Sequence, residues 1–421
     1  MTLLLVKSDP KIGVVFVGKQ FSLSMITILL LSVTIIPRMS VYSSAQTEDI
    51  YWPIESWRVS TLQEQDMNEQ RIDRLVERIE DGSAVRSLLI IRNGYIVFER
   101  YRQGYDSNSL MHIFSCTKSF ISALIGIALR KGYIDSIDDP ILPYFPNWTI
   151  ENVDARKERM TIRDLLTMTP GVDWNEHNIS YSSPDNMVNK MLTSDNPAKF
   201  VLDLKMVSEP GLDYRYNTGA SQVLSALLRE VTGIRPMEYA KEFLFEPLGI
   251  SDIAWALTRV DTNLGGSQLY IRSRDMARFG YLYLQHGVWN STTIIPSNYL
   301  EESKSPLIST YYGHEYGLHW WVDETHGYFC ALGSQGQGIF IDPTLNLMMV
   351  ITGGSDSIPM EVYFESYVQR AATEGYTTDG SEEPPPLEPD YRVVVIFGFM
   401  ITGAVAIMLV LIYPKQRKST Q

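Results

Sequence analysis

Hydrophobic and polar positions in the first third of the chain predict a helix, a hairpin and a second helix. Apolar residues recur at helix spacing within residues 61–81. Two β-rich runs follow in residues 87–105, and Asn93-Gly94 lies between them. An Asn-Gly pair between apolar runs is a strong hairpin signal. A long apolar stretch at residues 114–131 then predicts a buried helix.

The pattern changes twice more along the chain. Residues 135–257 read mostly as helices and loops. Strand signals return at residues 317–322, 327–333 and 338–352, and the last two flank turn residues, which predicts another antiparallel pair. Residues 360–372 predict a closing amphipathic helix. We therefore expect one α+β unit, with an antiparallel sheet built from both ends of the sequence and an inserted helical subdomain.

Two longer apolar segments lie outside this unit. The uncharged run from Val393 to Tyr413 would be about 32 Å long as a helix, enough to span a bilayer. The basic tail at residues 414–421 predicts a cytoplasmic C-terminus. Residues 1–45 contain a shorter apolar run after three lysines, which predicts a signal peptide cleaved after Ala45 or an uncleaved signal anchor. Both segments predict the same orientation, with the middle of the chain on the extracytoplasmic side.

These segments divide the chain. Residues 377–390 are rich in proline and acid and lack apolar periodicity, so we expect a solvated stalk. The folded domain is then residues 51–373, followed by the stalk and by a transmembrane helix at residues 393–413. A core helix without a polar face is the alternative for that last segment, but such helices rarely run so long.

Charge and rare residues exclude several classes of function. The net charge is -13, with 49 acidic and 36 basic residues, which disfavours a nucleic-acid partner. Only two cysteines are present, Cys116 and Cys330, too few for a disulfide scaffold or a thiolate zinc site. The six histidines include no H-E-x-x-H motif, and His314 and His319, five positions apart, do not indicate a metal site. We therefore expect no metal and no cofactor.

The first candidate motif is Ser115 followed three residues later by Lys118, at the start of the apolar helix. At this spacing the hydroxyl and the amine share one helix face. The helix N-terminus and the apolar surroundings both lower the pKa of Lys118. A neutral amine can accept the serine proton, which makes Ser115 a nucleophile. The tetrapeptide alone also fits an ordinary surface helix start, and Cys116 should point away into the core.

The second candidate is Tyr216, which lies just before a helix that we expect at residues 220–232. A phenol near a lysine loses its proton more easily and can act as general base and acid. An ordinary packed tyrosine is the alternative.

The third candidate is the glycine-rich stretch at residues 331–338, before a strand. Glycines in a strand pattern indicate close approach of another group. A free N–H at this strand edge could be an oxyanion donor. A glycine-rich hairpin turn is the alternative.

In this order, the three elements resemble the serine β-lactamase-like family, which includes class C β-lactamases, penicillin-binding DD-peptidases, esterases and 6-aminohexanoate-dimer hydrolases. The resemblance covers roughly residues 88–372, with supporting stretches at 165–174 and 265–282. It implies a β-lactamase/transpeptidase-like fold. It also implies that Ser115 is the acylated nucleophile, Lys118 its base and Tyr216 a proton relay, with the N–H groups of Ser115 and Ser334 as the oxyanion hole.

Two departures from the family pattern bear on the substrate. Thr218 stands where lactamases have Asn, and Ala331 stands where their strand box has a lysine. The motifs are instead closest to those of 6-aminohexanoate-dimer hydrolases. We expect the substrate subsite to include Thr218, Gly333, Gln335 and Gly336.

The resulting hypothesis is a membrane-anchored serine hydrolase that cleaves small esters or linear amides. Two alternatives stay open. One is a catalytically silent binding or scaffold module of the same fold, although such a module has no reason to retain Ser115, Lys118 and Tyr216 together. The other is an enzyme of the β-lactamase or DD-peptidase type.

Overall fold

A computed structural model of the protein describes residues 50–80 and 84–376. Its strands are β1 Arg58–Val59, β2 Val85–Arg92, β3 Tyr95–Tyr101, β4 Leu110–His112, β5 Ile253–Trp255, β6 Leu269–Arg272, β7 Val288–Trp289, β8 Thr292–Thr293, β9 Ile308–Ser309, β10 Glu315–Tyr316, β11 Trp321–Asp323, β12 Tyr328–Gly333, β13 Gln337–Asp342 and β14 Leu347–Gly353.

The helices are α1 Glu69–Glu80, α2 Thr117–Lys131, α3 Ala155–Arg159, α4 Ile162–Leu166, α5 Met187–Thr193, α6 Pro197–Leu202, α7 Thr218–Thr232, α8 Pro236–Ala240, α9 Ser273–Leu284, α10 Ser297–Ser303, α11 Met360–Tyr363 and α12 Arg370–Glu374. Short 3-10 turns are η1 Phe114–Cys116 and η2 Leu142–Tyr144, and π-helical segments are η3 Lys241–Phe245 and η4 Phe364–Gln369.

The main sheet joins the two ends of the described chain. Its strand order is β1-β3-β2-β14-β13-β12-β11-β10-β9, so the early hairpin β2–β3 pairs with the late strand β14. This confirms the predicted assembly of the sheet from both sequence ends. The sheet is not wholly antiparallel as expected, because β1 pairs in parallel with β3.

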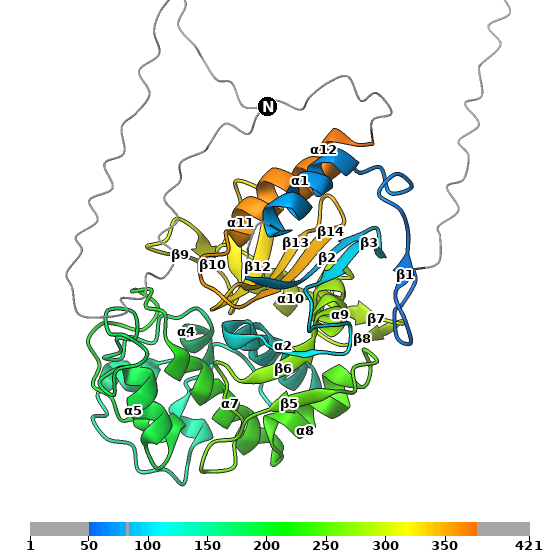
Figure 1. Ribbon diagram of the computed structural model, residues 1–421. Coiled ribbons are helices and arrows are strands. Elements are labelled where there is room, and N and C mark those ends of the chain that lie inside the picture. Colours follow the sequence, from blue (N-terminus) through cyan, green and yellow to red (C-terminus); the bar gives the residue numbers. More distant parts are fainter. Residues whose placement is uncertain (1–49, 81–83, 377–421) are drawn as a thin grey trace, which may run out of the picture. The chain divides into compact units, whose positions relative to one another are not determined.

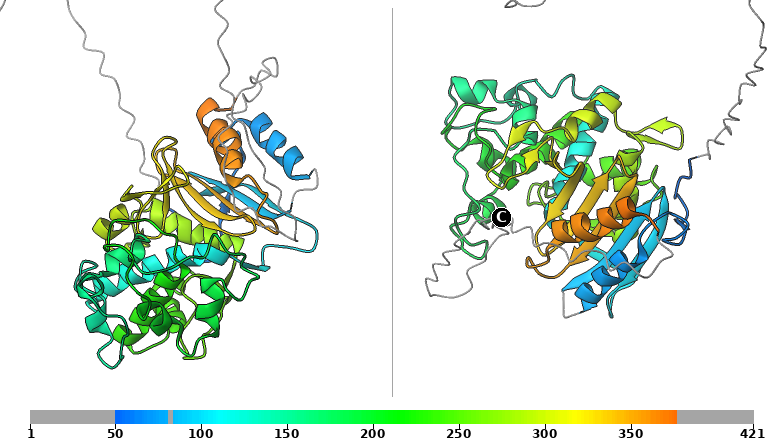
Figure 2. Two further views of the ribbon diagram at one scale, coloured as in Figure 1. Left: turned by 90° about the vertical axis from the view of Figure 1, so that its left-hand side faces the viewer. Right: turned by 90° about the horizontal axis from the view of Figure 1, so that it is seen from above.

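The predicted hairpin is present because its turn suits the twist of the strands. Asn93 and Gly94 both have positive φ angles, 52° and 80°, as the tight turn requires. Leu88 to Ile91 in β2 are all buried, since helices cover both faces of the sheet. Helices α1, α11 and α12 lie together over one face, and α2 and α9 lie on the other (Figures 1 and 2).

Three predicted elements differ in extent from those observed. The first helix begins only at Glu69, where the side chain of Asn68 accepts the N–H of Arg71 at 3.1 Å. The strand expected at residues 317–322 is limited to β11, because the backbone turns sharply at His319, where φ is 61°. The closing helix contains the π-helical segment η4 between α11 and α12.

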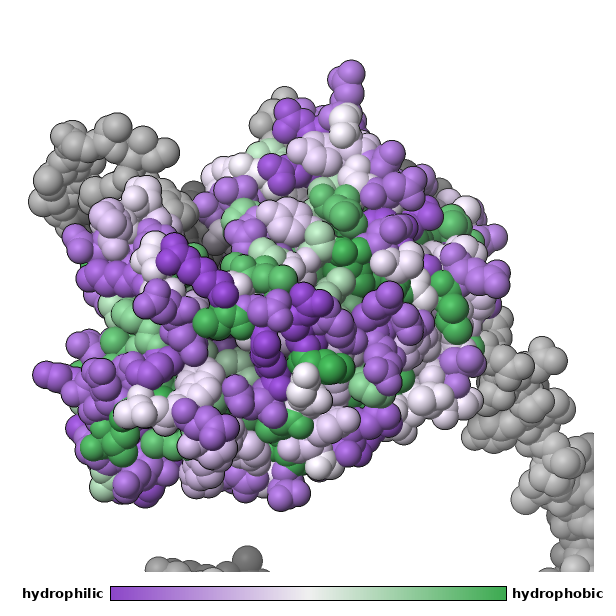
Figure 3. Space-filling view, turned by 90° about the horizontal axis from the view of Figure 1, so that it is seen from below, coloured by the Kyte–Doolittle hydropathy of each residue, from purple (hydrophilic) through white to green (hydrophobic). Residues whose placement is uncertain are grey.

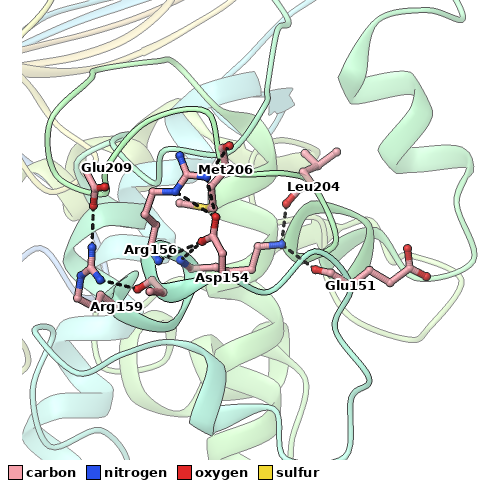
Figure 4. Close-up of polar contacts among 9 residues, drawn as sticks. Glu151, Asp154, Arg156, Arg159, Leu204, Met206 and Glu209 are labelled. Carbon is pink, nitrogen blue, oxygen red and sulfur yellow. Dashed lines mark hydrogen bonds and ion pairs between the residues drawn. The ribbon is translucent and has the colours of Figure 1, made fainter.

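The helical subdomain is inserted between the two halves of the sheet, and its short helices depend on polar contacts. A five-residue helix has little stability of its own. In α3, the Asp154 side chain accepts the N–H groups of Arg156 and Lys157, and Arg159 pairs with Glu209 at 2.8 Å (Figure 4). The buried Lys157 ammonium donates to the carbonyls of Glu151, Leu202 and Leu204. A small sheet of order β4-β6-β5 accompanies these helices.

The surface seen from below in Figure 3 has apolar residues scattered among polar ones. No helix within the described ranges has the length and hydrophobicity that a membrane crossing requires. The predicted signal segment, stalk, transmembrane helix and basic tail all lie outside the described residues.

Candidate active site

Ser115 occupies the short turn η1 that leads into α2. The preceding residue, Phe114, has a positive φ of 46°, a conformation that is strained for a bulky side chain. Lys118 follows one helical turn later, and its Nζ lies 3.2 Å from Ser115 Oγ. The predicted pairing of hydroxyl and amine on one helix face is therefore present.

The Lys118 amine is held in an almost closed environment. Its side chain is only 2% exposed, and Nζ also contacts Thr218 Oγ1 at 3.2 Å and the Gly266 carbonyl at 2.9 Å. Burial lowers the pKa of Lys118 to about 8, and the nearby Glu176 carboxylate opposes this shift. The amine is thus neutral in a minority of molecules at neutral pH, but far more often than an ordinary lysine.

Tyr216 lies beside this pair, and its ring centroid is 4.8 Å from Lys118 Nζ. The expectation that its phenol loses the proton easily is wrong in direction. Burial raises the pKa of Tyr216 well above its ordinary value, the Glu176 charge adds to this, and the hydrogen bond with Ser115 only partly opposes it. The Tyr216 phenol therefore keeps its proton in the resting site.

Glu176 is a site residue that the sequence did not reveal. Its buried carboxylate accepts four hydrogen bonds, from Trp174 Nε1 at 2.7 Å, Tyr181 Oη at 2.9 Å, and the N–H and hydroxyl of Thr218 at 2.8 and 3.0 Å. The Thr218 hydroxyl also contacts Lys118. A chain of contacts therefore runs from Glu176 through Thr218 to Lys118. In this structure the Thr218 hydroxyl helps to position the lysine amine.

The end of β12 lies against the turn that carries Ser115. A Cβ at position 333 would stand 2.4 Å from the Ile113 carbonyl oxygen and 3.1 Å from the Ser115 nitrogen, so only glycine fits there. Ser334 follows directly, in the turn between β12 and β13. The two predicted oxyanion donors, Ser115 and Ser334, are thus carried by adjoining segments.

Gln335 and Gly336 complete that turn and have positive φ angles of 63° and 80°. The Gln335 N–H donates to Asp356 Oδ1 at 2.5 Å, which fixes the turn against the segment after β14. A substrate role for either residue stays a prediction.

Two histidines near the site are neutral packing groups. His112 stacks between Phe114 and Tyr270, and burial lowers its pKa to about 4. His319 Nε2 lies 3.0 Å from Ser221 Oγ, and burial lowers the pKa of His319 to about 3. As predicted, Cys116 points into the core, with its sulfur 3.5 Å from the Ala331 carbonyl.

Aromatic side chains form a wall next to Tyr216. Trp321 stacks on Tyr216 with ring centroids 6.1 Å apart, and Tyr312 packs edge-on against Trp321 at 6.0 Å. The neighbouring Trp320 is buried in the core against Tyr283 and Phe329. The adjacent tryptophans therefore have different surroundings, with Trp320 in the core and Trp321 beside Tyr216.

Comparison with known proteins decides the family. The beta-lactamase family model matches residues 70–357, more than half of the chain. The chain belongs to the beta-lactamase family. This confirms the resemblance drawn from the motifs, and the protein is a serine hydrolase of this family.

Individual relatives within this family are distant. The 6-aminohexanoate-dimer hydrolase of Paenarthrobacter ureafaciens is 22% identical over an alignment of 300 residues that covers 66% of this chain and 75% of that one. A solved structure from Bacillus anthracis, provisionally described as a 6-aminohexanoate-dimer hydrolase, has a TM-score of 0.64 and 22% identity, covering 76% of this chain and 88% of that one. The structure of a family VIII carboxylesterase has a TM-score of 0.59 and 15% identity, and the match covers 75% of this chain and 98% of that one. These two structural likenesses concern the fold alone.

Proposed function

We propose that this serine hydrolase cleaves ester or linear amide bonds through an acyl-enzyme on Ser115. The observation that carries the proposal is the buried Lys118 amine, 3.2 Å from Ser115 Oγ and with a pKa lowered to about 8. Such an amine can take the hydroxyl proton as Ser115 Oγ attacks the substrate carbonyl. The N–H groups of Ser115 and Ser334 would stabilise the oxyanion that forms.

Tyr216 would complete the proton transfer. Because burial raises its pKa, Tyr216 keeps its proton until the leaving group needs one. Tyr216 then protonates the leaving alcohol or amine and recovers a proton from the Lys118 ammonium. In the second half-reaction the same groups deprotonate a water molecule, which attacks the acyl-enzyme and releases the acid.

The substrate preference follows from the two departures in the motifs. The Thr218 hydroxyl is engaged by Lys118 and Glu176, and the apolar Ala331 on β12 is 1% exposed. Thr218 cannot hold a β-lactam amide as an Asn would, and Ala331 cannot hold the β-lactam carboxylate as a Lys would. We therefore favour esters and linear amides over β-lactams, in keeping with the name of the Paenarthrobacter relative.

We further propose that the enzyme works outside the cytoplasm, anchored to a membrane through residues 393–413. The uncharged sequence of that segment, its basic flank and the apolar leader at residues 1–45 support this location.

The activity is tested by labelling the purified protein with a fluorophosphonate probe and by assaying p-nitrophenyl esters, nitrocefin and aminohexanoate oligomers. We expect labelling at Ser115, turnover of short esters and very slow turnover of nitrocefin. The Ser115→Ala variant is the control and should show neither labelling nor turnover. Rapid nitrocefin hydrolysis would refute the substrate preference, and an unlabelled Ser115 would favour the silent binding module.

A further inference from the structure

Two histidines and three carboxylates meet at a place that the proposed catalytic reaction does not use. They come from three separate segments and form what we call the His/carboxylate cluster. Asp323 ends β11, His326 lies in the turn to β12, and His314 precedes β10. Glu361 and Glu365 come from α11 and η4, and Figure 1 shows α11 beside β9, β10 and β12.

Three side chains of the cluster converge on one small volume, and His314 and Glu361 extend it outward from Asp323. Asp323 Oδ2 lies 2.9 Å from His326 Nδ1 and 3.6 Å from His314 Nδ1. His326 Nδ1 also lies 3.6 Å from Glu365 Oε1, and His314 Nε2 lies 3.4 Å from Glu361 Oε1. Each of Asp323, His326 and Glu365 offers one ligand atom within 4.8 Å of the others.

These separations suit a bound ion. Tetrahedral ligands at zinc–nitrogen and zinc–oxygen distances of about 2.0–2.1 Å stand roughly 3.3 Å from one another. The contacts of His326 Nδ1 with Asp323 Oδ2 and Glu365 Oε1, at 2.9 and 3.6 Å, bracket that spacing. Imidazole nitrogen and carboxylate oxygen are also the donors that zinc accepts together.

The charge balance favours a cation over a simple ion-pair network. Three carboxylates face two imidazoles, and Asp323 is only 6% exposed. A divalent cation would relieve this crowding of negative charge, and the exposed fractions of 25% and 28% for Glu365 and His326 leave it a path from solvent.

Neighbouring groups already orient the ligands. Tyr328 Oη donates to Glu365 Oε1 at 2.8 Å, and the His326 N–H donates to Asp323 Oδ1 at 2.9 Å. Gln369 Nε2 donates to the His326 carbonyl at 2.9 Å. Hydrogen bonds of this kind hold ligands in place at established metal sites.

We propose that Asp323, His326 and Glu365 bind one divalent transition-metal ion with the preferences of zinc, with His314 and Glu361 completing or supporting the coordination. The site is structural, and it takes no part in the chemistry at Ser115. It departs from our expectation from the sequence of no metal and no metal role for His314, because only the fold brings these residues together. It joins the β11–β12 turn and the loop before β10 to the C-terminal helical segment. Because Tyr312 lies two residues before His314 and packs on Trp321, the ion would also hold the aromatic wall of the active site in place.

The test is metal binding by the purified full chain after removal of metals with EDTA. We expect one equivalent of Zn²⁺ to bind, with a rise in the melting temperature, since a ligand that binds only the folded state stabilises it. Co²⁺ should bind to the same site and give a visible absorption band that reports its coordination. His326→Ala and the near-isosteric Glu365→Gln should lower the affinity at least about 100-fold, and Tyr328→Phe about 10-fold.

His286→Ala is the matched control, because His286 Nδ1 also contacts a carboxylate, Glu301, at 3.1 Å but does so at an exposed position with a single acid. This variant should bind metal as the unchanged protein does. The proposal is overturned if the unchanged protein binds no more Zn²⁺ than Glu365→Gln does. The proposal is equally overturned if His286→Ala lowers the Zn²⁺ affinity as much as His326→Ala does.

Discussion

At the scale of single residues, the proposed chemistry depends on how far burial keeps Lys118 neutral. An ordinary lysine has a pKa of about 10.4 and is almost wholly charged at pH 7, whereas a pKa of about 8 leaves roughly one amine in ten neutral. The proton can leave Ser115 only when that amine is neutral. The pH at which the activity rises therefore reports the pKa of Lys118.

The first prediction is a pH profile. Since the neutral amine is the active form, kcat/KM for an ester should rise about tenfold per pH unit on the acid side and level off above pH 8. The measurement is initial rates of p-nitrophenyl ester hydrolysis between about pH 5.5 and 9.5, corrected for spontaneous hydrolysis. A profile without this rising limb would exclude Lys118 as the base.

The second prediction concerns Glu176, which raises the pKa of Lys118 and anchors Thr218. In Glu176→Gln the carboxylate charge is lost, so the midpoint of the rising limb should move to lower pH. The buried hydrogen bonds are also disturbed, which should cost about 1–3 kcal/mol of stability in a denaturant titration.

The control for this prediction is Glu209→Gln, which removes an exposed carboxylate that pairs with Arg159. Glu209→Gln should leave the midpoint of the rising limb unchanged. It should change the free energy of unfolding by no more than about 0.5 kcal/mol. A midpoint that stays in place or rises in Glu176→Gln would contradict the electrostatic role assigned to Glu176.

Single residues also show where sequence reasoning ends. Ser115 and Lys118 were predictable because three positions on a helix fix their distance. Glu176 was not, because an acid in a loop carries no local sign of its burial or of its contact with Thr218, 42 positions away. The direction of the pKa shift of Tyr216 was not predictable either. A nearby cation favours a lower pKa, but the loss of solvation on burial is the larger effect and raises it.

At the scale of elements, the site depends on the close approach of β12 to the turn η1. Gly333 allows this approach, since a Cβ there would overlap the Ile113 carbonyl. The third prediction is that Gly333→Ala separates the two segments and disturbs the oxyanion donors, lowering kcat by about 10²–10³-fold. Steady-state ester hydrolysis measures this loss.

The control at this scale is Gly132→Ala, at the left-handed end of α2, where φ is 75° and a Cβ would meet no atom within 4 Å. It should cost about 1 kcal/mol of stability and leave kcat unchanged. If both variants lose kcat equally, general destabilisation explains the effect and the oxyanion assignment fails.

Elements with strong local signals were predicted well, and those decided by distant contacts were not. The hairpin at Asn93-Gly94 and the pair β12–β13 are fixed by turn residues and apolar runs. The run at residues 338–352 was expected as one strand, but it forms two, β13 and β14, because the chain turns at residues 343–346. The parallel pairing of β1, a two-residue strand, has no sequence signature. The restriction of β11 to Trp321–Asp323 follows from the backbone at His319, where the side chain is buried against Ser221 on α7.

At the scale of the whole molecule, the chain combines a hydrolase domain with terminal segments that we propose to direct its location. The C-terminal end of the described domain is held by the domain itself, because Glu374 accepts two hydrogen bonds from Arg71 and the Tyr376 N–H donates to Asp66 at 2.9 Å. The segment beyond Tyr376 can therefore be removed without cutting these contacts.

The fourth prediction is that a chain ending at Tyr376 leaves the membrane fraction and keeps the ester turnover of the full chain. Residues 393–413 would supply most of the membrane affinity, whereas the active site lies wholly before them. Fractionation of cells that express the two versions, followed by esterase assays of each fraction, measures both properties. If the shortened chain stays with the membrane after its leader is also removed, the assigned anchor is wrong.

The most direct test of the central claim is to trap the acyl-enzyme. The protein is mixed with a p-nitrophenyl ester, quenched with acid within the first turnovers, and analysed by intact mass and peptide mass spectrometry. The account predicts a mass increase equal to the acyl group, located on Ser115 and absent in Ser115→Ala. Turnover of the ester without an acyl group on Ser115, or with the acyl group on another residue, would contradict it.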